Sequence, residues 1–573
     1  MTFSSRSTNR SGRNGAGPGQ GTQLRSFDDK GEIMENAQVV IIGGGATGTG
    51  ILWDLALRGI PAILLEQKDL ANGATGRCHG LLHSGGRYVV KDPDAAGECN
   101  AENKIIKYIA PHCVQDTGGL FVMCRQDDPK FFGQWSEACE KNGLPFQRLS
   151  ADETLDLEPN LPRDILGAFT CADAHVQVFD LTLSNIESAV ARGARFKTYC
   201  EVRAIDIENG RVKGVRCCDT QTGEESYIGC EIVVNAAGGW SQKVAELAGV
   251  EVPVRCDKGT LLVLNHRLSK RVINRCRKPG DADILVPAGP VCILGTSSIT
   301  VPGPEGLTAS QEEIQHLLDL GAELVPALAE ARILRIFCGA RPLYVPPSIS
   351  TAGGREISRG FALLDHEPLD HVKGFISIVG GKVTTYRLMA KAVSDLIAQK
   401  LGVDAPCMTH MTLLRPQRDE AALRKAHQLL PLPVVEMADK RLGPNLAKIV
   451  RAIEARPELA EVVCECELVT RAELEFVLGS ETSVPAKTIN DVGRRTRLGL
   501  GTCQGTFCGY KAMLAGFQTH RWSAAEASEQ FEHYLDERWK GQSWIKQGKQ
   551  VEQLYLSRDL FGVEYNFHGF EGR

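Results

Sequence analysis

Residues 39–50, VVIIGGGATGTG, combine a short apolar run, a cluster of glycines and a run of small residues. Gly43, Gly45 and Gly48 stand in G-x-G-x-x-G order. In this order the first glycine permits a tight turn, the second lets backbone approach a pyrophosphate, and the third lets a helix pack on a strand. The N-terminus of that helix presents free N–H groups to phosphates. The stretch therefore predicts the turn of a dinucleotide-binding β-α-β unit.

The flanking residues complete this unit. Residues 37–42 supply an apolar first strand, and residues 51–59 continue the helix with an apolar face. A second strand, residues 61–65, ends in Glu66, an acid suitably placed to bind ribose hydroxyls. The alternative, a glycine-rich turn in some other α/β protein, is the weaker one because the whole unit is present.

Length and composition restrict the class of protein. The chain has 573 residues and a net charge of −5, so more than one domain is expected and general nucleic-acid binding is not. Most of the 19 cysteines stand singly in apolar segments, which indicates small buried side chains in a reducing cytoplasm. No apolar run approaches the ~20 residues that span a bilayer, so membrane attachment is expected to be peripheral or through a partner.

The order of segments predicts a mixed α/β and α+β architecture. Residues 1–36 are polar and lack an apolar period, so a disordered tail is expected there. Two further strand-to-glycine elements, EIVVNAAGGW at 231–240 and GFISIVGGKVTTYR at 374–387, indicate returns to the first sheet after long excursions. We expect a Rossmann-like domain with an interleaved mixed-sheet substrate domain over 37–402, a connecting region over 403–460, a small helical cysteine domain over 461–525 and a helical tail over 526–573.

Several motifs follow the glycine turn in a fixed order: GATGRCHGLLHSGGRY, VVNAAGGW, FCGARPL, EISRGF and GGKVTTYR. Over residues 38–400 the chain resembles the flavin-dependent glycerol-3-phosphate dehydrogenases of the D-amino-acid-oxidase-like superfamily. With its C-terminal cysteines it resembles the catalytic subunits of the anaerobic type. The resemblance implies oxidation of sn-glycerol 3-phosphate to dihydroxyacetone phosphate, with FAD as the cofactor.

The three strand-to-glycine elements suit one extended cofactor that contacts them all, whereas an NAD enzyme needs only the first. The helix after the third element would point its positive end at the flavin and stabilise the negative charge of reduction. The resemblance implies these FAD-binding residues: Gly43, Gly45, Gly48, Glu66, Thr75, Gly76, Ala237, Gly238, Gly380, Gly381 and Thr384.

Three basic residues beside glycines or strand ends indicate an anionic substrate: Arg341 in GARPL, Arg359 in ISRG and Lys382 in GGKVTTY. Arginine binds phosphate in a bidentate fork. The resemblance implies that these three residues hold the substrate phosphate. Two alternatives stay open, namely a dehydrogenase of an amino or hydroxy acid on the same scaffold, and a non-catalytic electron-transfer or scaffold protein.

Alcohol oxidation needs a base for the hydroxyl proton, and histidine titrates near neutral pH. His83 in LLHSGG is the candidate and His79 is the second choice, with a purely structural histidine as the alternative. Arg87 or Tyr88 would stabilise the developing alkoxide. Single-subunit relatives carry a histidine just after the position of Lys258, where Gly-Thr-Leu stands here, so the resemblance supplies no second catalytic histidine.

The last four cysteines are paired by their spacing, Cys464 and Cys466 as C-x-C and Cys503 and Cys508 as C-x₄-C. Thiolates bind zinc and iron–sulfur clusters, but C-x-C fits structural zinc poorly. The module resembles the [2Fe–2S] domain of bacterioferritin-associated-ferredoxin-like proteins. Zinc and unpaired thiols remain the alternatives.

A cluster of this kind implies that electrons leave the flavin one at a time for a protein partner. The resemblance implies a second flavoprotein subunit, an iron–sulfur subunit that anchors the complex to the membrane, and menaquinone as acceptor. The chain would then lie in the cytoplasm, on the inner face of the membrane. Arg494, Arg495 and Arg497 either favour the cluster's negative charge or form a solvated run.

Overall fold

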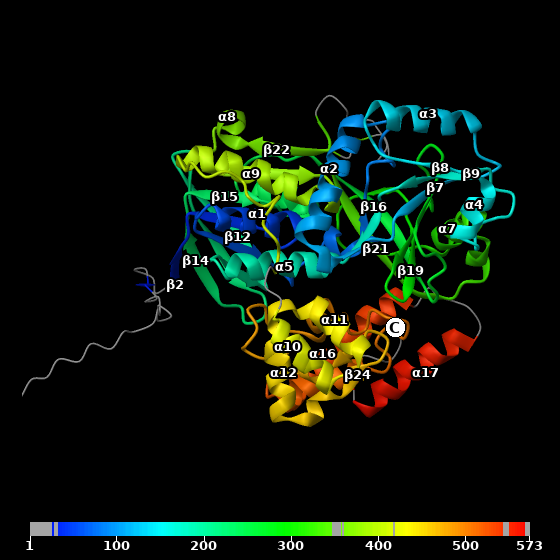
Figure 1. Ribbon diagram of the computed structural model, residues 1–573. Helices are drawn as coiled ribbons and strands as arrows, with labels where there is room; N and C mark the ends of the chain where they lie inside the picture. Colours follow the sequence, from blue (N-terminus) through cyan, green and yellow to red (C-terminus); the bar gives the residue numbers. More distant parts are fainter. Residues whose placement is uncertain are drawn as a thin grey trace, which may run out of the picture.

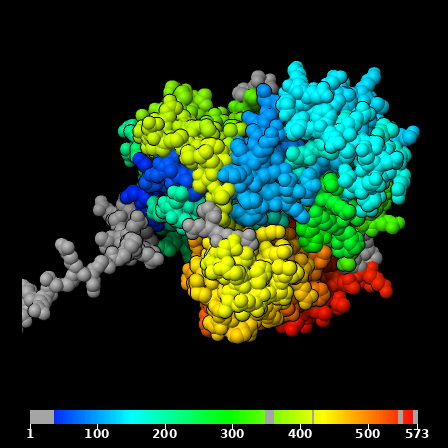
Figure 2. All heavy atoms as spheres, in the orientation of Figure 1, coloured from blue at the N-terminus to red at the C-terminus, as the bar shows by residue number. Residues whose placement is uncertain are grey.

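The computed structural model describes residues 26–27, 33–346, 357, 360–415, 419–542, 549–565 and 567. Figure 1 shows a large body of sheets and helices, coloured blue to green, above a helical C-terminal part in yellow to red. The space-filling view shows the same two parts in close contact (Figure 2). The predicted α/β and α+β architecture is confirmed.

The glycine turn follows β3, a central strand of a six-stranded sheet. Among the described residues, the strands of this sheet have the order β11-β4-β3-β15-β23-β22. The first five strands are parallel and β22 is antiparallel to β23. Because β3, β15 and β23 are neighbours, the three strand-to-glycine elements meet at the carboxyl edge, as predicted. The strands are β3 (Val39–Ile42), β4 (Ala62–Glu66), β11 (Arg195–Thr198), β15 (Ile232–Asn235), β22 (Phe361–Asp365) and β23 (Phe375–Gly380).

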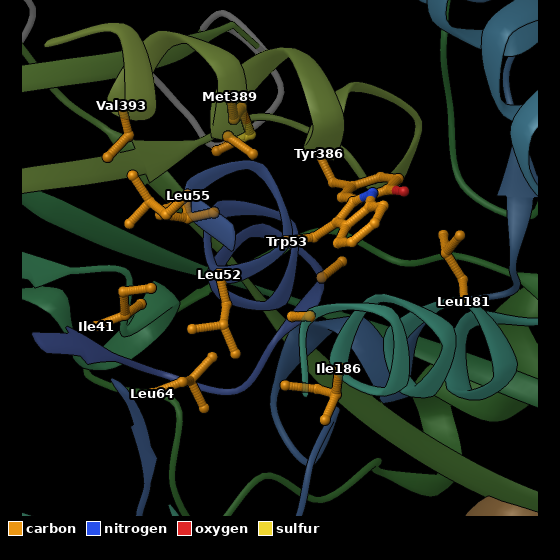
Figure 3. Packing of buried hydrophobic residues seen from close by; sticks show 14 of the residues in the cluster. Ile41, Leu52, Trp53, Leu55, Leu64, Leu181, Ile186, Tyr386, Met389 and Val393 are labelled. Carbon is orange, nitrogen blue, oxygen red and sulfur yellow. The ribbon is translucent and has the colours of Figure 1, made fainter. Parts of the chain in front are cut away.

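Three helices cover one face of this sheet: α1 (Ala46–Leu57), α5 (Val178–Val190) and α9 (Tyr386–Leu401). Figure 3 shows Leu52 of α1 between the strands and the other helices, with Tyr386 of α9 beside Trp53. Burial of this apolar layer fixes α1 on β3, and with it the position of the glycine turn.

A second sheet covers the opposite face, in the order β1-β2-β14-β13-β12. Its strands are β1 (Ser26–Phe27), β2 (Ile33–Asn36), β12 (Cys200–Glu208), β13 (Arg211–Asp219) and β14 (Glu225–Gly229). The expectation of a disordered tail up to residue 36 is wrong at its end. β2 pairs in parallel with β14, which satisfies its backbone groups. Residues 1–25 and 28–32 lie outside the described part of the chain.

The interleaved region builds a larger sheet of nine described strands, β20-β16-β19-β18-β17-β7-β9-β8 with β21 paired to β16. Helix α7 (Gln311–Leu324) packs on it. The longest strands are β16 (Val254–Leu264) and β21 (Ile333–Tyr344). The others are β7 (Gly119–Met123), β8 (Arg148–Leu149), β9 (Gly167–Cys171), β17 (Val272–Arg275), β18 (Ile284–Ala288), β19 (Val291–Gly295) and β20 (Ile299–Val301).

Further helices and a small sheet complete the body. They are the 3₁₀ helix η1 (Ala74–Arg77), a small sheet of β5 (Leu81–Leu82), β10 (Ala174–Val176) and β6 (Val114–Gln115), and the helices α2 (Pro93–Ile109), α3 (Pro129–Lys141), α4 (Ala151–Leu157), α6 (Ser241–Glu246) and α8 (His366–Asp370). Of these elements, η1 lies between the N-terminus of α1, which Thr75 contacts, and β21, where the backbone of Arg77 packs against Gly339.

The C-terminal part is helical, and its apolar cores cross the boundaries expected at residues 460 and 525. Phe531 of α16 shares a core with Cys464 and Val469, and Ala472 of α13 packs with the preceding helices. Its helices are α10 (Glu420–Leu429), α11 (Leu432–Leu442), α12 (Leu446–Ala455), α13 (Arg471–Leu478), α14 (Ile489–Thr496), α15 (Gly509–Gln518), α16 (Ala524–Gln542) and α17 (Lys549–Glu564), with a β24 (Val462–Cys464) and β25 (Val469–Thr470) hairpin.

Candidate functional site

A cavity of about 920 Å³ lies where the carboxyl edge of the six-stranded sheet faces β21. Most of the predicted site residues line it: Gly43, Gly45, Glu66, Thr75, His79, His83, Arg87, Tyr88, Ala237, Gly238, Arg341, Gly380, Gly381 and Lys382. Gly48, Gly76 and Thr384 are absent from the lining. Arg359 lies outside the described residues.

Glu66, the last residue of β4, lines the cavity. Its carboxylate accepts hydrogen bonds from the backbone N–H of Gly44 at 2.7 Å and of Lys68 at 2.9 Å. Burial raises the pKa of Glu66, and these two hydrogen bonds act against the rise. Each carboxylate oxygen has two lone pairs. Glu66 therefore has acceptor capacity left for the hydroxyls of a ribose.

The glycine turn itself is tightly packed. Gly43 has a φ of +116°, and a Cβ there would lie 2.5 Å from the carbonyl oxygen of Ala236, so only glycine fits. Gly48 packs against the backbone of Gly43, which explains its absence from the lining. Thr75 accepts a hydrogen bond from the N–H of Ala46, the first residue of α1, at 3.1 Å. These contacts place the N-terminus of α1 at the cavity, and a helix N-terminus suits the pyrophosphate of FAD.

Arg341 extends from β21 toward the cavity and is held from behind by a buried acid. Its Nη1 lies 2.7 Å from Oδ2 of Asp257 and donates to the carbonyl oxygen of Ser297, while Nη2 donates to Thr296. A Cβ at Gly259 would lie 2.5 Å from Nη2 of Arg341. The glycine after Lys258 thus has a physical reason, because any larger residue there would displace this guanidinium.

His83, Tyr88 and Lys382 form one group across the cavity. The hydroxyl of Tyr88 lies 3.4 Å from Nε2 of His83, and Nζ of Lys382 lies 4.9 Å from the centre of the Tyr88 ring. The backbone N–H of His83 donates to Oγ1 of Thr384 at 3.0 Å. Thr384 therefore joins the histidine loop to the start of α9, although its side chain is buried away from the cavity.

His79 lies near His83, with ring centroids 6.5 Å apart. Burial, aided by the charges of Arg341 and Arg87, lowers the pKa of His79 to about 3. A group that binds a proton this weakly is a poor general base at neutral pH. The lowered pKa of His79 thus favours His83 as the candidate base.

Arg87 is held in place by Asp283, an acid to which sequence reasoning assigned no role. Nη2 of Arg87 lies 2.9 Å from Oδ2 of Asp283, a carboxylate that also accepts from Arg277 and from the N–H of Gly280. Nη1 of Arg87 is buried and has no hydrogen-bond partner within the described residues. Arg87 itself lines the cavity, so its guanidinium charge lies close to a ligand bound there.

Sequence reasoning missed the two acids that hold the site arginines, Asp257 and Asp283. Both are buried, and each stands in or beside an apolar strand, β16 or β18. A charged residue inside such a strand is itself a signal, because burial of a carboxylate is costly without a partner. The sequence does not show which arginine each acid meets.

The four C-terminal cysteines are brought together from segments about 40 residues apart. All four are free thiols, and Sγ of Cys466 lies 3.6 Å from Sγ of Cys503. Hydrogen bonds from Cys466 and Cys508 lower the pKa of both Cys464 and Cys503. Each sulfur therefore has two sulfur neighbours. Within the described residues, no three His, Cys, Asp or Glu side chains are arranged as ligands of a metal ion.

The arginines near these cysteines are not a solvated run. Arg497 pairs with the buried Glu467, with its Nε 2.7 Å from Oε2. Arg494 and Arg495 both contact Asp69, in the segment after β4. Arg494 and Arg495 thus hold α14 against the body, whereas Arg497 joins two segments within the C-terminal part. No helix in the described part of the chain combines the length and apolarity needed to cross a membrane.

Comparisons with known proteins agree with this architecture. The family model described as "FAD dependent oxidoreductase" matches residues 38–439. The chain is 40% identical to the A1 subunit of the anaerobic glycerol-3-phosphate dehydrogenase of Haloferax volcanii, over 93% of this chain and 91% of that protein. It is also 40% identical to the corresponding protein of Escherichia coli, over 92% and 96% of the two chains.

Solved structures show the same fold at lower identity. The glycerol-3-phosphate dehydrogenase of Bacillus halodurans complexed with FAD aligns with a TM-score of 0.66 at 23% identity, covering 90% of this chain and 96% of that one. Glycine oxidase of Geobacillus kaustophilus aligns with a TM-score of 0.54 at 20% identity, covering 67% and 100%. The chain belongs to the FAD-dependent oxidoreductase family and, within it, to the family of anaerobic glycerol-3-phosphate dehydrogenase A subunits.

Proposed function

We propose that the chain oxidises sn-glycerol 3-phosphate to dihydroxyacetone phosphate with FAD as cofactor. The observation that carries the proposal is the cavity of about 920 Å³. Cationic Arg341, Lys382 and Arg87 line it together with His83 and the glycine turn. A substrate with a dianionic phosphate at one end and an alcohol at the other matches these two kinds of group. The names of the 40% identical relatives support the same substrate.

Each residue of the cavity has a proposed role that follows from the chemistry of its side chain. Arg341 and Lys382 would bind the phosphate, and the buried Asp257 keeps the Arg341 guanidinium aimed before the substrate arrives. His83 would accept the C2 hydroxyl proton at a ring nitrogen, with the Tyr88 hydroxyl 3.4 Å from Nε2 to orient it. The guanidinium of Arg87, which lines the cavity, would stabilise the negative charge that develops on the C2 oxygen. Bound FAD supplies the acceptor for the hydride from C2.

The cofactor residues fit FAD by their placement. Gly43, Gly45 and Thr75 lie at the N-terminus of α1 for the pyrophosphate, and Glu66 lies at the end of β4 for a ribose. Gly380 and Gly381 precede the helix that starts at Tyr386, so that its N-terminal end lies next to the cavity. Gly76 and Thr384 would act indirectly, by shaping the loops on which these groups stand.

We further propose that Cys464, Cys466, Cys503 and Cys508 hold a [2Fe–2S] cluster. The support is the donor set, four free thiols that are neighbours in one small helical part. Backbone N–H groups of Glu467 and Gly499 also donate toward Cys464, as suits a sulfur that carries negative charge. Electrons would leave through this centre to a second flavoprotein subunit, next to an iron–sulfur anchor subunit, and then to menaquinone. The chain would thus act in the cytoplasm, at the inner face of the membrane.

The test is anaerobic purification followed by flavin, iron and zinc analysis and a flavin spectrum with each substrate. Glycerol 3-phosphate should bleach the FAD absorbance within one turnover, whereas glycine, proline and lactate should not. Bleaching by an amino or hydroxy acid instead would favour the alternative reaction on this scaffold, which glycine oxidase exemplifies in fold alone. Absence of bleaching with every substrate would point to a non-catalytic role. Zinc in place of iron and sulfide would refute the cluster.

A further inference from the structure

A second cavity, of about 1140 Å³, lies between the oxidoreductase body and the C-terminal helices. Its walls include η1 and β21 of the body, and α14 and α16 of the C-terminal part. Figure 1 shows the C-terminal helices below the body where these elements meet. Cys78 and His79 line both cavities, and Leu500 and Gln504 of the cysteine loop line the second. The second cavity therefore lies between the proposed FAD site and the four cysteines.

Two arginines on its wall, Arg77 and Arg335, are partly buried and differ in their partners from the other arginines of the interface. Within the described residues neither forms an ion pair with an acid, and Nε of Arg335 is buried without a hydrogen-bond partner. Arg494 and Arg495 in the same region both pair with Asp69, and Arg497 pairs with Glu467. The cavity wall thus carries two arginines that form no ion pair within the described residues.

Burial acts on these two arginines accordingly. It lowers the pKa of Arg335 to about 10 and also lowers the pKa of Arg77, while the paired Arg494 and Arg497 have raised pKa values. The charge of Glu537 on α16 partly offsets the effect at both unpaired arginines, and the charge of Arg494 adds to it. Both arginines line the same cavity, Arg77 from η1 and Arg335 from β21.

The acids that line the cavity form no ion pair with Arg77 or Arg335 within the described residues, and Glu201 among them lies 3.6 Å from Nε of Arg203. Asp69 is committed to Arg494 and Arg495, and Glu537 has an exposed side chain on α16. Glu526 and Glu529 line the cavity from the start of the same helix and are exposed as well. Residues 543–548, which follow α16, contain no Asp or Glu. Guanidinium groups that line a cavity without an acidic partner can donate charge-assisted hydrogen bonds to an anion bound there.

We propose that this cavity is a second ligand site, which binds a small organic phosphate through Arg77 and Arg335. Two guanidinium groups match the charge of a phosphate dianion, and their fork geometry matches its oxygens. The cavity is much larger than a phosphate ion, so it has room for an organic group toward Cys78 and the cysteine loop. The bound molecule would contact both the body and the C-terminal part, and would stabilise their association.

The experiment is a calorimetric titration of the FAD-loaded protein with pyrophosphate as the probe. It is performed with the Arg341→Gln variant as background, so that the proposed substrate site does not contribute. Binding near one equivalent is expected, and an added Arg335→Gln or Arg77→Gln substitution should weaken it at least ~10-fold, the loss of one charge-assisted contact. Arg148→Gln, which changes an exposed arginine on β8, should leave it unchanged. No binding, or binding that the Arg335 and Arg77 substitutions do not weaken, would overturn the proposal.

Thermal unfolding without the probe supplies the second readout. Arg335→Gln removes an unneutralised charge, so the melting temperature should stay the same or rise. Arg497→Gln, the matched control, leaves Glu467 buried and unpaired, and should lower it. If Arg335→Gln instead destabilises the protein as much as Arg497→Gln, Arg335 has a structural role and the ligand site is wrong.

Discussion

Asp69 and Arg495 form a bidentate ion pair between residues 426 positions apart in the sequence, with Nη1–Oδ2 at 2.8 Å and Nη2–Oδ1 at 2.9 Å. Both side chains are buried. Asp69 follows β4, the strand that ends in Glu66, and Arg495 lies on α14, just before the cysteine loop. The pair therefore connects the proposed FAD site directly to the part that carries the four cysteines.

Replacement of Asp69 by Asn should loosen the C-terminal part, since it leaves Arg495 buried with one partner fewer. Loss of one member of a buried pair costs about 3–5 kcal/mol. A urea titration, monitored by proteolytic cleavage of the C-terminal helices, should show a lower midpoint of unfolding than the wild type. Glu225→Gln, which breaks an exposed pair with Arg203, should cost at most ~1 kcal/mol. Equal effects of the two variants would contradict the interpretation.

The same pair predicts a pH dependence. Burial alone would raise the pKa of Asp69, but attraction and hydrogen bonding from Arg495, helped by Arg494, hold this pKa well below its ordinary value. A carboxyl whose pKa is lower in the folded state stabilises the fold above its unfolded pKa, about 4, and loses this contribution as the pH falls further. The wild-type C-terminal part should loosen below about pH 4, and Asp69→Asn should show a weaker dependence there.

Arg341→Ala should raise KM for glycerol 3-phosphate by ~10²-fold or more, through loss of a charge-assisted phosphate contact. Oxidation of glycerol, which has no phosphate, should hardly change. Steady-state rates with both substrates measure the difference, and Arg148→Ala serves as the control on an exposed strand. Equal losses with both substrates would assign Arg341 a structural role.

His83→Gln should lower the rate of flavin bleaching in a single turnover by ~10²–10⁴-fold, the usual contribution of a general base. FAD content and binding of glycerol 3-phosphate should persist, because Arg341 and the glycine turn are unchanged. His79→Gln should have a smaller effect, since the low pKa of His79 makes it a weak base. A larger loss in the His79 variant would reverse the assignment.

Cys503→Ser should weaken or abolish the proposed cluster, because an alkoxide is a poorer ligand for iron than a thiolate. FAD should stay bound, since the cavity lined by the glycine turn is made by residues before 400. Single-turnover bleaching should remain near the wild-type rate, while turnover with the natural partner should fail and a dye that reaches the flavin should restore it. Cys230→Ser, at a thiol outside the four, should keep full turnover. Loss of FAD in the Cys503 variant would instead indicate that the four cysteines have a structural role.

The sequence by itself determined the dinucleotide-binding unit and its two returning strands. Glycine spacing and short apolar runs are local patterns. A strand, a turn and a helix can therefore be recognised from neighbouring residues alone. β3, β15 and β23 accordingly lie side by side as predicted. The end of the N-terminal tail was mispredicted because Ile33–Asn36 forms a strand only by pairing with β14, almost 200 residues later.

Only the tertiary structure decided which charges meet. Asp257 behind Arg341, Asp283 behind Arg87 and Asp69 against Arg495 join segments that are 84, 196 and 426 residues apart. Nothing in a local pattern specifies such a partner, because burial in a common core sets it and sequence spacing does not. The same holds for Arg77 and Arg335, whose lack of an acidic partner among the described residues becomes visible only when η1, β21 and α16 surround one cavity.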